Sequence, residues 1–146
     1  MNALKSIPVL VEAPATRDSC YQNTLPILHE ITHALRRLQQ EQLPTTIDLN
    51  AIPFGPGDEQ RLLEFLGRGE VSAHLEALGN SSVWESGYPG IWVIEHRNES
   101  GERVALQIEI TTLPAILATH PDDITESLSS LQKALENPSL GHRIGD

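Results

Sequence analysis

Residues 102–110, ERVALQIEI, constrain the fold of this chain more than any other segment. Apolar side chains at every second position, from Val104 to Ile110, alternate with polar or small ones. Because successive side chains of a strand point to opposite faces of a sheet, this spacing predicts a strand with one packed face and one solvated face. Such strands are typical of antiparallel sheets.

Three further segments are strand-like. Residues 90–98, GIWVIEHRN, precede the turn residues NESG, which predict a hairpin with residues 102–110. Residues 45–49, TTIDL, are short and β-branched, and residues 70–78 alternate in the same way. We therefore expect about four to five strands, connected mainly as a meander.

Helical periodicity marks three other segments. In residues 25–38 apolar side chains recur every three or four positions, which predicts an amphipathic helix that ends before the proline at position 44. A short helix is expected at residues 58–66, with Asp58 as N-cap and Gly67 as the stop. The final helix, in residues 122–137, begins with acidic residues and carries an apolar stripe made of Ile124, Leu128, Leu131 and Leu135.

This order of segments predicts an α+β fold, an antiparallel meander sheet packed on one face by two to three helices. A chain of 146 residues is long enough for one hydrophobic core. We expect a single domain over residues 21–137, closed by the final helix. Residues 1–20 are expected to form an extended or mobile N-terminal arm, and residues 138–146 a C-terminal tail.

The composition excludes several classes of partner. Twenty acidic and ten basic residues give a net charge of −10, so nucleic acid and anionic membranes would be repelled. The apolar run at residues 7–11 is too short for a signal sequence or a membrane span, and we expect a cytoplasmic protein without membrane insertion. The single cysteine, Cys20, excludes an internal disulfide.

One motif points to metal chemistry. Residues 29–33, HEITH, match H-E-x-x-H, in which His29 and His33 bind zinc from one face of a helix and Glu30 acts as general base. The motif resembles that of thermolysin-like metalloproteases.

The surroundings of this motif weaken the zinc hypothesis. The apolar stripe of the helix lies nearly opposite His29 and His33, which predicts that both are on the solvent side. A third ligand would have to come from the next helix, where Glu59 and Glu64 are the only candidates. A zinc metallopeptidase-like protein or a metal carrier that uses this helix stays an alternative, and no cofactor is assigned.

Residues 84–98, WESGYPGIWVIEHRN, hold both tryptophans and one of the two tyrosines of the chain. Gly87, Pro89 and Gly90 predict a turn with Tyr88 exposed at its tip. Trp92 alternates with its neighbours and points away from them. The two tryptophans fit either the core or a protein-binding surface, because Trp and Tyr dominate interface hot spots.

Several segments together resemble the conserved region of the HupH/HyaF hydrogenase expression/formation proteins. The most specific are LGRGEVSA, residues 66–73, and ESGYPGIWVIEHRNESGE, residues 85–102. The resemblance extends from residue 24 to about residue 135, through TTIDLNAIPFGPGDEQRLLEFLGRGEVSAHLEALG and IEITTLPAIL followed by PDDI. The similarity of LPILHEITHAL is weaker, because it rests mainly on apolar spacing.

The resemblance implies an accessory protein without catalytic activity, a chaperone or scaffold in the maturation of [NiFe] uptake hydrogenase. Its partner would be a hydrogenase subunit or another maturation factor. The oligomeric state is not predicted. Under this hypothesis the partner-binding surface consists of Glu70, Trp84, Glu85, Gly87, Tyr88, Pro89, Gly90, Trp92, His96 and Arg97.

Overall fold

The structure is a computed structural model that describes residues 23–77 and 79–137. The chain divides after Thr112 into two compact units, and each is described by itself. The predicted N-terminal arm and C-terminal tail lie outside the described residues, so both stay predictions. No helix in the described ranges is long and apolar enough to cross a membrane.

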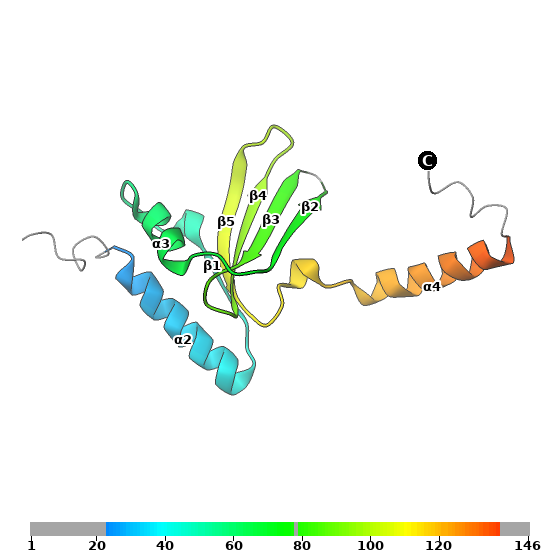
Figure 1. The fold of residues 1–146 in the computed structure, drawn as a ribbon, viewed down its shortest axis with the longest axis horizontal. Helices are drawn as coiled ribbons and strands as arrows, with labels where there is room; N and C mark the ends of the chain where they lie inside the picture. Colours follow the sequence, from blue (N-terminus) through cyan, green and yellow to red (C-terminus); the bar gives the residue numbers. More distant parts are fainter. Residues whose placement is uncertain (1–22, 78, 138–146) are drawn as a thin grey trace, which may run out of the picture. The chain divides into compact units, whose positions relative to one another are not determined.

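Within residues 23–77 and 79–112, the first unit contains a five-stranded sheet and two α-helices (Figure 1). Along the chain its elements are α2 (Leu25–Glu41), β1 (Thr45–Asp48), the 3-10 helix η1 (Leu49–Ala51), α3 (Asp58–Leu66), β2 (Ser72–Glu76), β3 (Asn80–Glu85), β4 (Ile91–Arg97) and β5 (Arg103–Ile110). The predicted α+β class is confirmed.

All neighbouring strands of the sheet are antiparallel, in the order β1-β5-β4-β3-β2. Strands β2 to β5 form the predicted meander, and β1 is added beside β5 at the far edge. Strand β3 is the one strand that the sequence patterns did not indicate separately. It is short of apolar residues at its start, NSS, and its place is fixed by pairing with β2 and β4.

α2 and α3 lie on the same face of the sheet (Figure 1). The core consists of the buried side chains between these two helices and the sheet. Ile27, Ile31 and Ala34 of α2 are buried there. The other buried members of this cluster are Ile47, Leu49, Leu62, Leu66, Trp84, Ile91, Val93, Leu106, Ile108 and Ile110. Full burial of one large aliphatic side chain stabilises a fold by roughly 1.5–3 kcal/mol, so this layer holds the helices on the sheet.

Asp58 has a different role from the predicted N-cap. The N-cap of α3 is Gly57, and Asp58 is the first helical residue. The buried Asp58 carboxylate accepts hydrogen bonds from the N–H of Gly55 (2.8 Å) and the amide of Asn23 (3.0 Å), and it pairs with Arg61. It thus organises the turn before α3. Gly67 ends the helix as predicted, with φ +64°.

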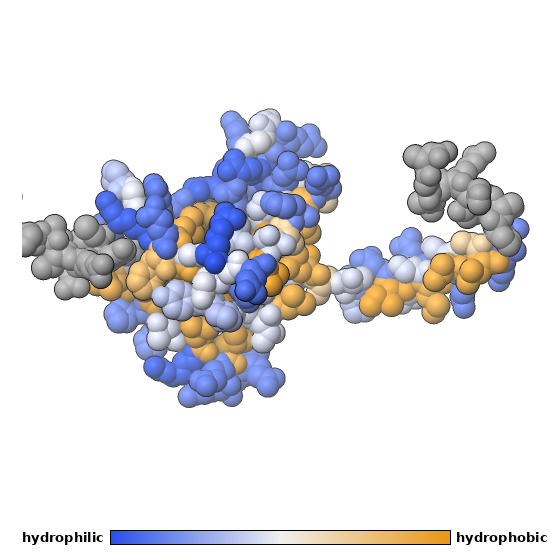
Figure 2. All heavy atoms as spheres, viewed as in Figure 1, coloured by the Kyte–Doolittle hydropathy of each residue, from blue (hydrophilic) through white to orange (hydrophobic). Residues whose placement is uncertain are grey.

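The second unit contains the 3-10 helix η2 (Ala115–Leu117) and α4 (Pro121–Glu136), which confirms the final helix. The apolar stripe predicted on this helix is visible along α4 in Figure 2. Its four members, Ile124, Leu128, Leu131 and Leu135, are exposed by 59% to 72%. That this helix closes the domain stays a prediction.

Candidate functional site

The turn between β3 and β4, Ser86–Gly90, is held by its own hydrogen bonds. The buried Ser86 hydroxyl donates to the carbonyl of Tyr88 (2.9 Å) and accepts from the N–H of Tyr88 (3.1 Å). The backbone N–H groups of Ser86 and Ile91 donate to the carbonyls of Ile91 (2.8 Å) and Tyr88 (3.1 Å). Gly90 closes the turn with φ +92°, which favours glycine. Tyr88 is therefore presented by a fixed backbone.

A second segment, Gly67–Val71, fastens this turn to the end of α3. The N–H of Gly69 donates to the carbonyl of Glu85 (2.7 Å), and the N–H of Glu85 donates to the carbonyl of Val71 (2.9 Å). A Cβ atom on Gly69 would lie only 2.6 Å from the carbonyl oxygen of Ser86, so the approach requires glycine. The segments LGRGE and ESGYPG are thus direct neighbours in the fold.

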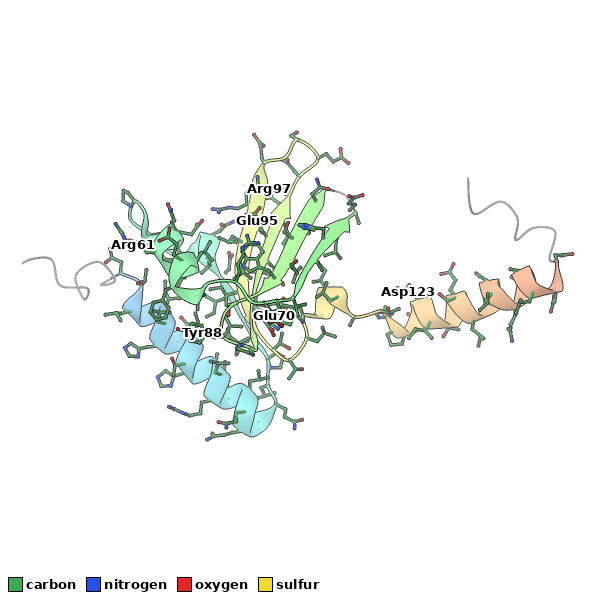
Figure 3. The ribbon with its side chains drawn as sticks, viewed as in Figure 1. Arg61, Glu70, Tyr88, Glu95, Arg97 and Asp123 are labelled. Atoms are coloured by element: carbon green, nitrogen blue, oxygen red, sulfur yellow. The ribbon has the colours of Figure 1, made fainter. Side chains whose placement is uncertain are left out.

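Tyr88 lies beside α2 and α3 (Figure 3) and forms one wall of an apolar groove. Its ring stacks on Phe65, with the centroids 6.1 Å apart and the planes at 11°. The exposed fractions are 48% for Tyr88, 45% for Phe65 and 40% for Leu25. The groove has a volume of about 280 Å³, and its lining residues are Leu25, Leu28, His29, Ile31, Thr32, Leu35, Phe65, Leu66, Tyr88 and Ile91.

A more polar hollow of about 770 Å³ is lined in part by Pro89 and Gly90 of the same turn. Thr32 and Leu35 line both the groove and this hollow, so α2 forms a continuous wall along the two. Arg36 and Glu85 bring charge to the hollow. One oxygen of the half-buried Glu85 carboxylate accepts the N–H of Gly90 at 3.3 Å.

The two tryptophans lie on opposite faces of the sheet. Trp84 pairs directly with Val93 and faces the helices, where it is 8% exposed and the Arg68 guanidinium lies 4.2 Å from its ring centroid. Trp92 pairs with Glu85 on the other face, is 4% exposed, and donates from Nε1 to the carbonyl of Thr111 (3.1 Å). Both indoles are therefore part of the packed interior.

The remaining predicted residues divide between the two ends of the sheet. Glu70 is exposed in the segment before β2. His96 is half-buried, with Nδ1 2.8 Å from the hydroxyl of Ser81. Arg97 is exposed and pairs with Glu95 (2.6 Å), at the end of β4 away from Tyr88 (Figure 3).

The structure therefore unites half of the predicted surface. Five of the ten residues occupy one turn and its approach, namely Glu85, Gly87, Tyr88, Pro89 and Gly90. Glu70 lies in the segment that is hydrogen-bonded to Glu85, Trp84 and Trp92 are buried, and His96 and Arg97 lie at the other end of β4. The other walls of the groove come from Leu25 and Phe65, which the sequence analysis did not assign to a site. The sequence gives only a weak signal for Leu25 and Phe65, because an exposed apolar residue on an amphipathic helix cannot be told from a core residue by its spacing.

The HEITH residues lie on the solvent side of α2, as the stripe predicted: His29, Glu30 and His33 are all exposed. The expected third-ligand candidates have other partners, since Glu59 pairs with Arg103 (2.6 Å) and Glu64 accepts from Gln60. Among the described residues, no three or more His, Cys, Asp or Glu side chains form a group that could hold a metal ion.

One ion pair stabilises the position of α3. Arg103 of β5 donates to both oxygens of the Glu59 carboxylate, at 2.6 and 3.0 Å. This hydrogen bonding raises the pKa of Arg103, although partial burial opposes the rise. The ion pair connects the sheet to the helix that carries Phe65.

Taken together, the fold and the site define a small α+β protein with a rigid aromatic turn beside an apolar groove. The family described as HupH hydrogenase expression protein, C-terminal conserved region, matches residues 21–137. The chain belongs to this family.

Curated relatives and a solved structure agree with this assignment. The chain is 30% identical over 116 residues to the hydrogenase expression/formation protein HoxQ of Azotobacter vinelandii, and 28% identical to HupQ of Azotobacter chroococcum. Each alignment covers 78% of this chain but only 41% of the relative. The hydrogenase expression protein HupH from Thiobacillus denitrificans is 36% identical, with a TM-score of 0.76 over 79% of this chain and 96% of that one.

Proposed function

We propose that this protein is a non-catalytic accessory factor in the maturation of [NiFe] uptake hydrogenase, and that it acts by protein–protein binding. The partner is a hydrogenase subunit or another maturation factor, and the compartment is the cytoplasm. The family membership supports the process, because its curated relatives carry the name hydrogenase expression/formation protein. Those relatives are more than twice as long as the matched region, so the role of this chain is a proposal in its own right.

One observation carries the binding hypothesis: Tyr88 is half exposed on a backbone that is already fixed. A side chain that is ordered before binding loses little conformational entropy on association. Tyr is enriched in interface hot spots, which lie in well-packed pockets with apolar surroundings. The groove beside Tyr88 offers such surroundings. The proposed binding surface is the turn Ser86–Gly90 together with this groove.

Purification of the tagged protein from its own host, under conditions that induce hydrogenase, tests this proposal. Mass spectrometry should identify a hydrogenase subunit or maturation factor with the wild-type protein. The Tyr88→Ala variant should lose that partner. The matched control is Arg97→Ala, because Arg97 is equally on the surface but lies at the far end of β4.

Two results would argue against the proposal. Recovery of the wild-type protein without any hydrogenase-related protein would contradict the role in maturation. Equal loss of the partner in both variants, or retention in both, would contradict the location of the surface. Circular dichroism of each variant shows that the comparison is made between folded proteins.

A further inference from the structure

The groove and the adjoining hollow have different chemistry along one helix. The N-terminal half of α2 contributes Leu25 and Leu28 to the apolar groove, and the following turns contribute Arg36 and Gln39 to the hollow. Thr32 lines both the groove and the hollow. An occupant that follows α2 therefore meets an apolar pocket first and a positive charge second.

Arg36 forms no ion pair with any residue in the described parts of the chain. The helix itself explains this, because the positions three and four residues away are Thr32, His33, Gln39 and Gln40, none of which is a carboxylate. Arg36 is exposed. A guanidinium binds a carboxylate with two parallel hydrogen bonds.

The neighbouring charges do not remove this capacity. Glu85 lines the same hollow, but it is half-buried and accepts the N–H of Gly90. The adjacent Arg37 donates to the hydroxyl of Thr45. Elsewhere in the described residues Arg61, Arg97 and Arg103 all pair with carboxylates of the chain. Arg36 is thus the guanidinium that lines the hollow and has no acidic partner there.

The spacing of the two features sets the sequence that would fit. Leu28 and Arg36 are eight residues apart on α2. At a rise of 1.5 Å per residue this separation is about 12 Å, which an extended segment spans with about four residues. The groove volume of about 280 Å³ is small for a whole ligand, so it suits one large apolar side chain.

We infer that this surface binds a segment of a partner protein that carries a large apolar side chain and, about four residues away, a carboxylate. The apolar side chain occupies the groove against Tyr88 and Phe65, and the carboxylate pairs with Arg36. The inference rests on the proposed function only in that the occupant belongs to another protein.

Selection of random 12-residue peptides on the immobilised full-length protein tests this directly. The enriched sequences should combine Leu, Ile, Met or Phe with Asp or Glu about four positions away. Because the chain as a whole carries −10 charges, acidic peptides are disfavoured on average, so their enrichment reports a local cation. A fluorescent peptide of the enriched sequence then serves as the probe.

The probe should bind about tenfold more weakly to Arg36→Glu, because a charge-assisted hydrogen bond is replaced by like-charge repulsion. Arg37→Glu is the matched control, with the same change of charge one position away, and should bind nearly as wild type does. A probe with Lys in place of its acidic residue should bind Arg36→Glu better than wild type. Tyr88→Ala should weaken both probes.

Three outcomes would overturn the inference. Enriched peptides without an acidic residue would remove the role of Arg36, and so would equal weakening by Arg36→Glu and Arg37→Glu. A wild-type dimer that Tyr88→Ala converts to a monomer would assign the groove to a second copy. These assays contain no hydrogenase. A negative result in them would contradict only this inference, whereas a negative result in the purification from the host would contradict the proposed function.

Discussion

Trp92 and Tyr88 are four positions apart in the sequence, but their surroundings in the fold are opposite. Trp92 is 4% exposed, and its only polar group donates to a backbone carbonyl. Tyr88 is 48% exposed and stacks on Phe65, itself a half-exposed ring. The hydrogen bond of Trp92 completes the interior of the fold. The stacking of Tyr88 on Phe65 leaves aromatic surface available to another molecule.

The cluster of aromatic residues in the sequence therefore serves two purposes. The tryptophans fix the strands on either side of the turn, one on each face of the sheet. The tyrosine is carried by the turn between them. Substitutions of the buried tryptophans should therefore lower stability, whereas substitution of the exposed Tyr88 should mainly weaken partner binding.

The largest loss of stability is expected for Trp92→Ala. Removal of a buried tryptophan should lower the free energy of unfolding by about 3–5 kcal/mol, because the cavity stays largely unfilled. Trp92→Phe is the matched control, since it keeps a ring and removes the hydrogen bond to Thr111, and should lose less. Urea denaturation measures both. A loss below about 1 kcal/mol in Trp92→Ala would place this indole outside the core.

Gly69→Ala should be the next most harmful change. The new methyl group would meet the carbonyl of Ser86, and the backbone shift should cost about 1–3 kcal/mol, as overpacking usually does. It should also displace the turn, so partner binding falls as well. Glu70→Ala changes the exposed neighbour and should stay within about 0.5 kcal/mol of wild type. Equal stability of the two variants would show that the close approach is not required.

Ser86 is itself buried but holds the exposed Tyr88, so the effect of Ser86→Ala should be intermediate. The substitution removes two hydrogen bonds to the backbone of Tyr88 and should cost about 1–3 kcal/mol, at about 0.5–1.5 kcal/mol for each bond. The turn should become more mobile, which hydrogen exchange at the amide of Tyr88 would detect as faster exchange. The exposed Ser100 gives the matched Ser100→Ala control. Unchanged exchange in Ser86→Ala would mean that other contacts hold the turn.

The smallest effect on stability is expected for Tyr88→Ala. Loss of a stack between two half-exposed rings should cost less than about 1.5 kcal/mol, whereas partner binding should disappear. Tyr88→Phe keeps the stack and should keep most of the binding. Thermal unfolding and co-purification separate the two effects. A large fall in the melting temperature of Tyr88→Ala would make this residue structural.

Much of the fold could be predicted because the periodic segments are long and regular. The alternation from Val104 to Ile110 indicated β5 and its packed face, and the stripe of α2 indicated which side carries His29 and His33. Strand β3 was missed because Asn80, with two serines after it, is more typical of a loop. Its pairing with β2 and β4, a tertiary effect, makes it a strand.

The candidate site was only partly predictable for a similar reason. The turn Ser86–Gly90 is local, so glycine and proline indicated it. The groove is assembled from Leu25, Phe65 and Tyr88, which belong to three segments far apart in the sequence. Periodicity assigns such apolar residues to a core, and only the packing of α2, α3 and the turn leaves them at the surface.

The placement of the two tryptophans also gives the molecule two internal optical reporters. Trp84 lies under the guanidinium of Arg68, and Trp92 lies on the opposite side of the sheet. With Trp84→Phe or Trp92→Phe, the emission spectrum of the remaining indole monitors one layer at a time. The order in which the two layers loosen during unfolding can thus be followed without an added dye.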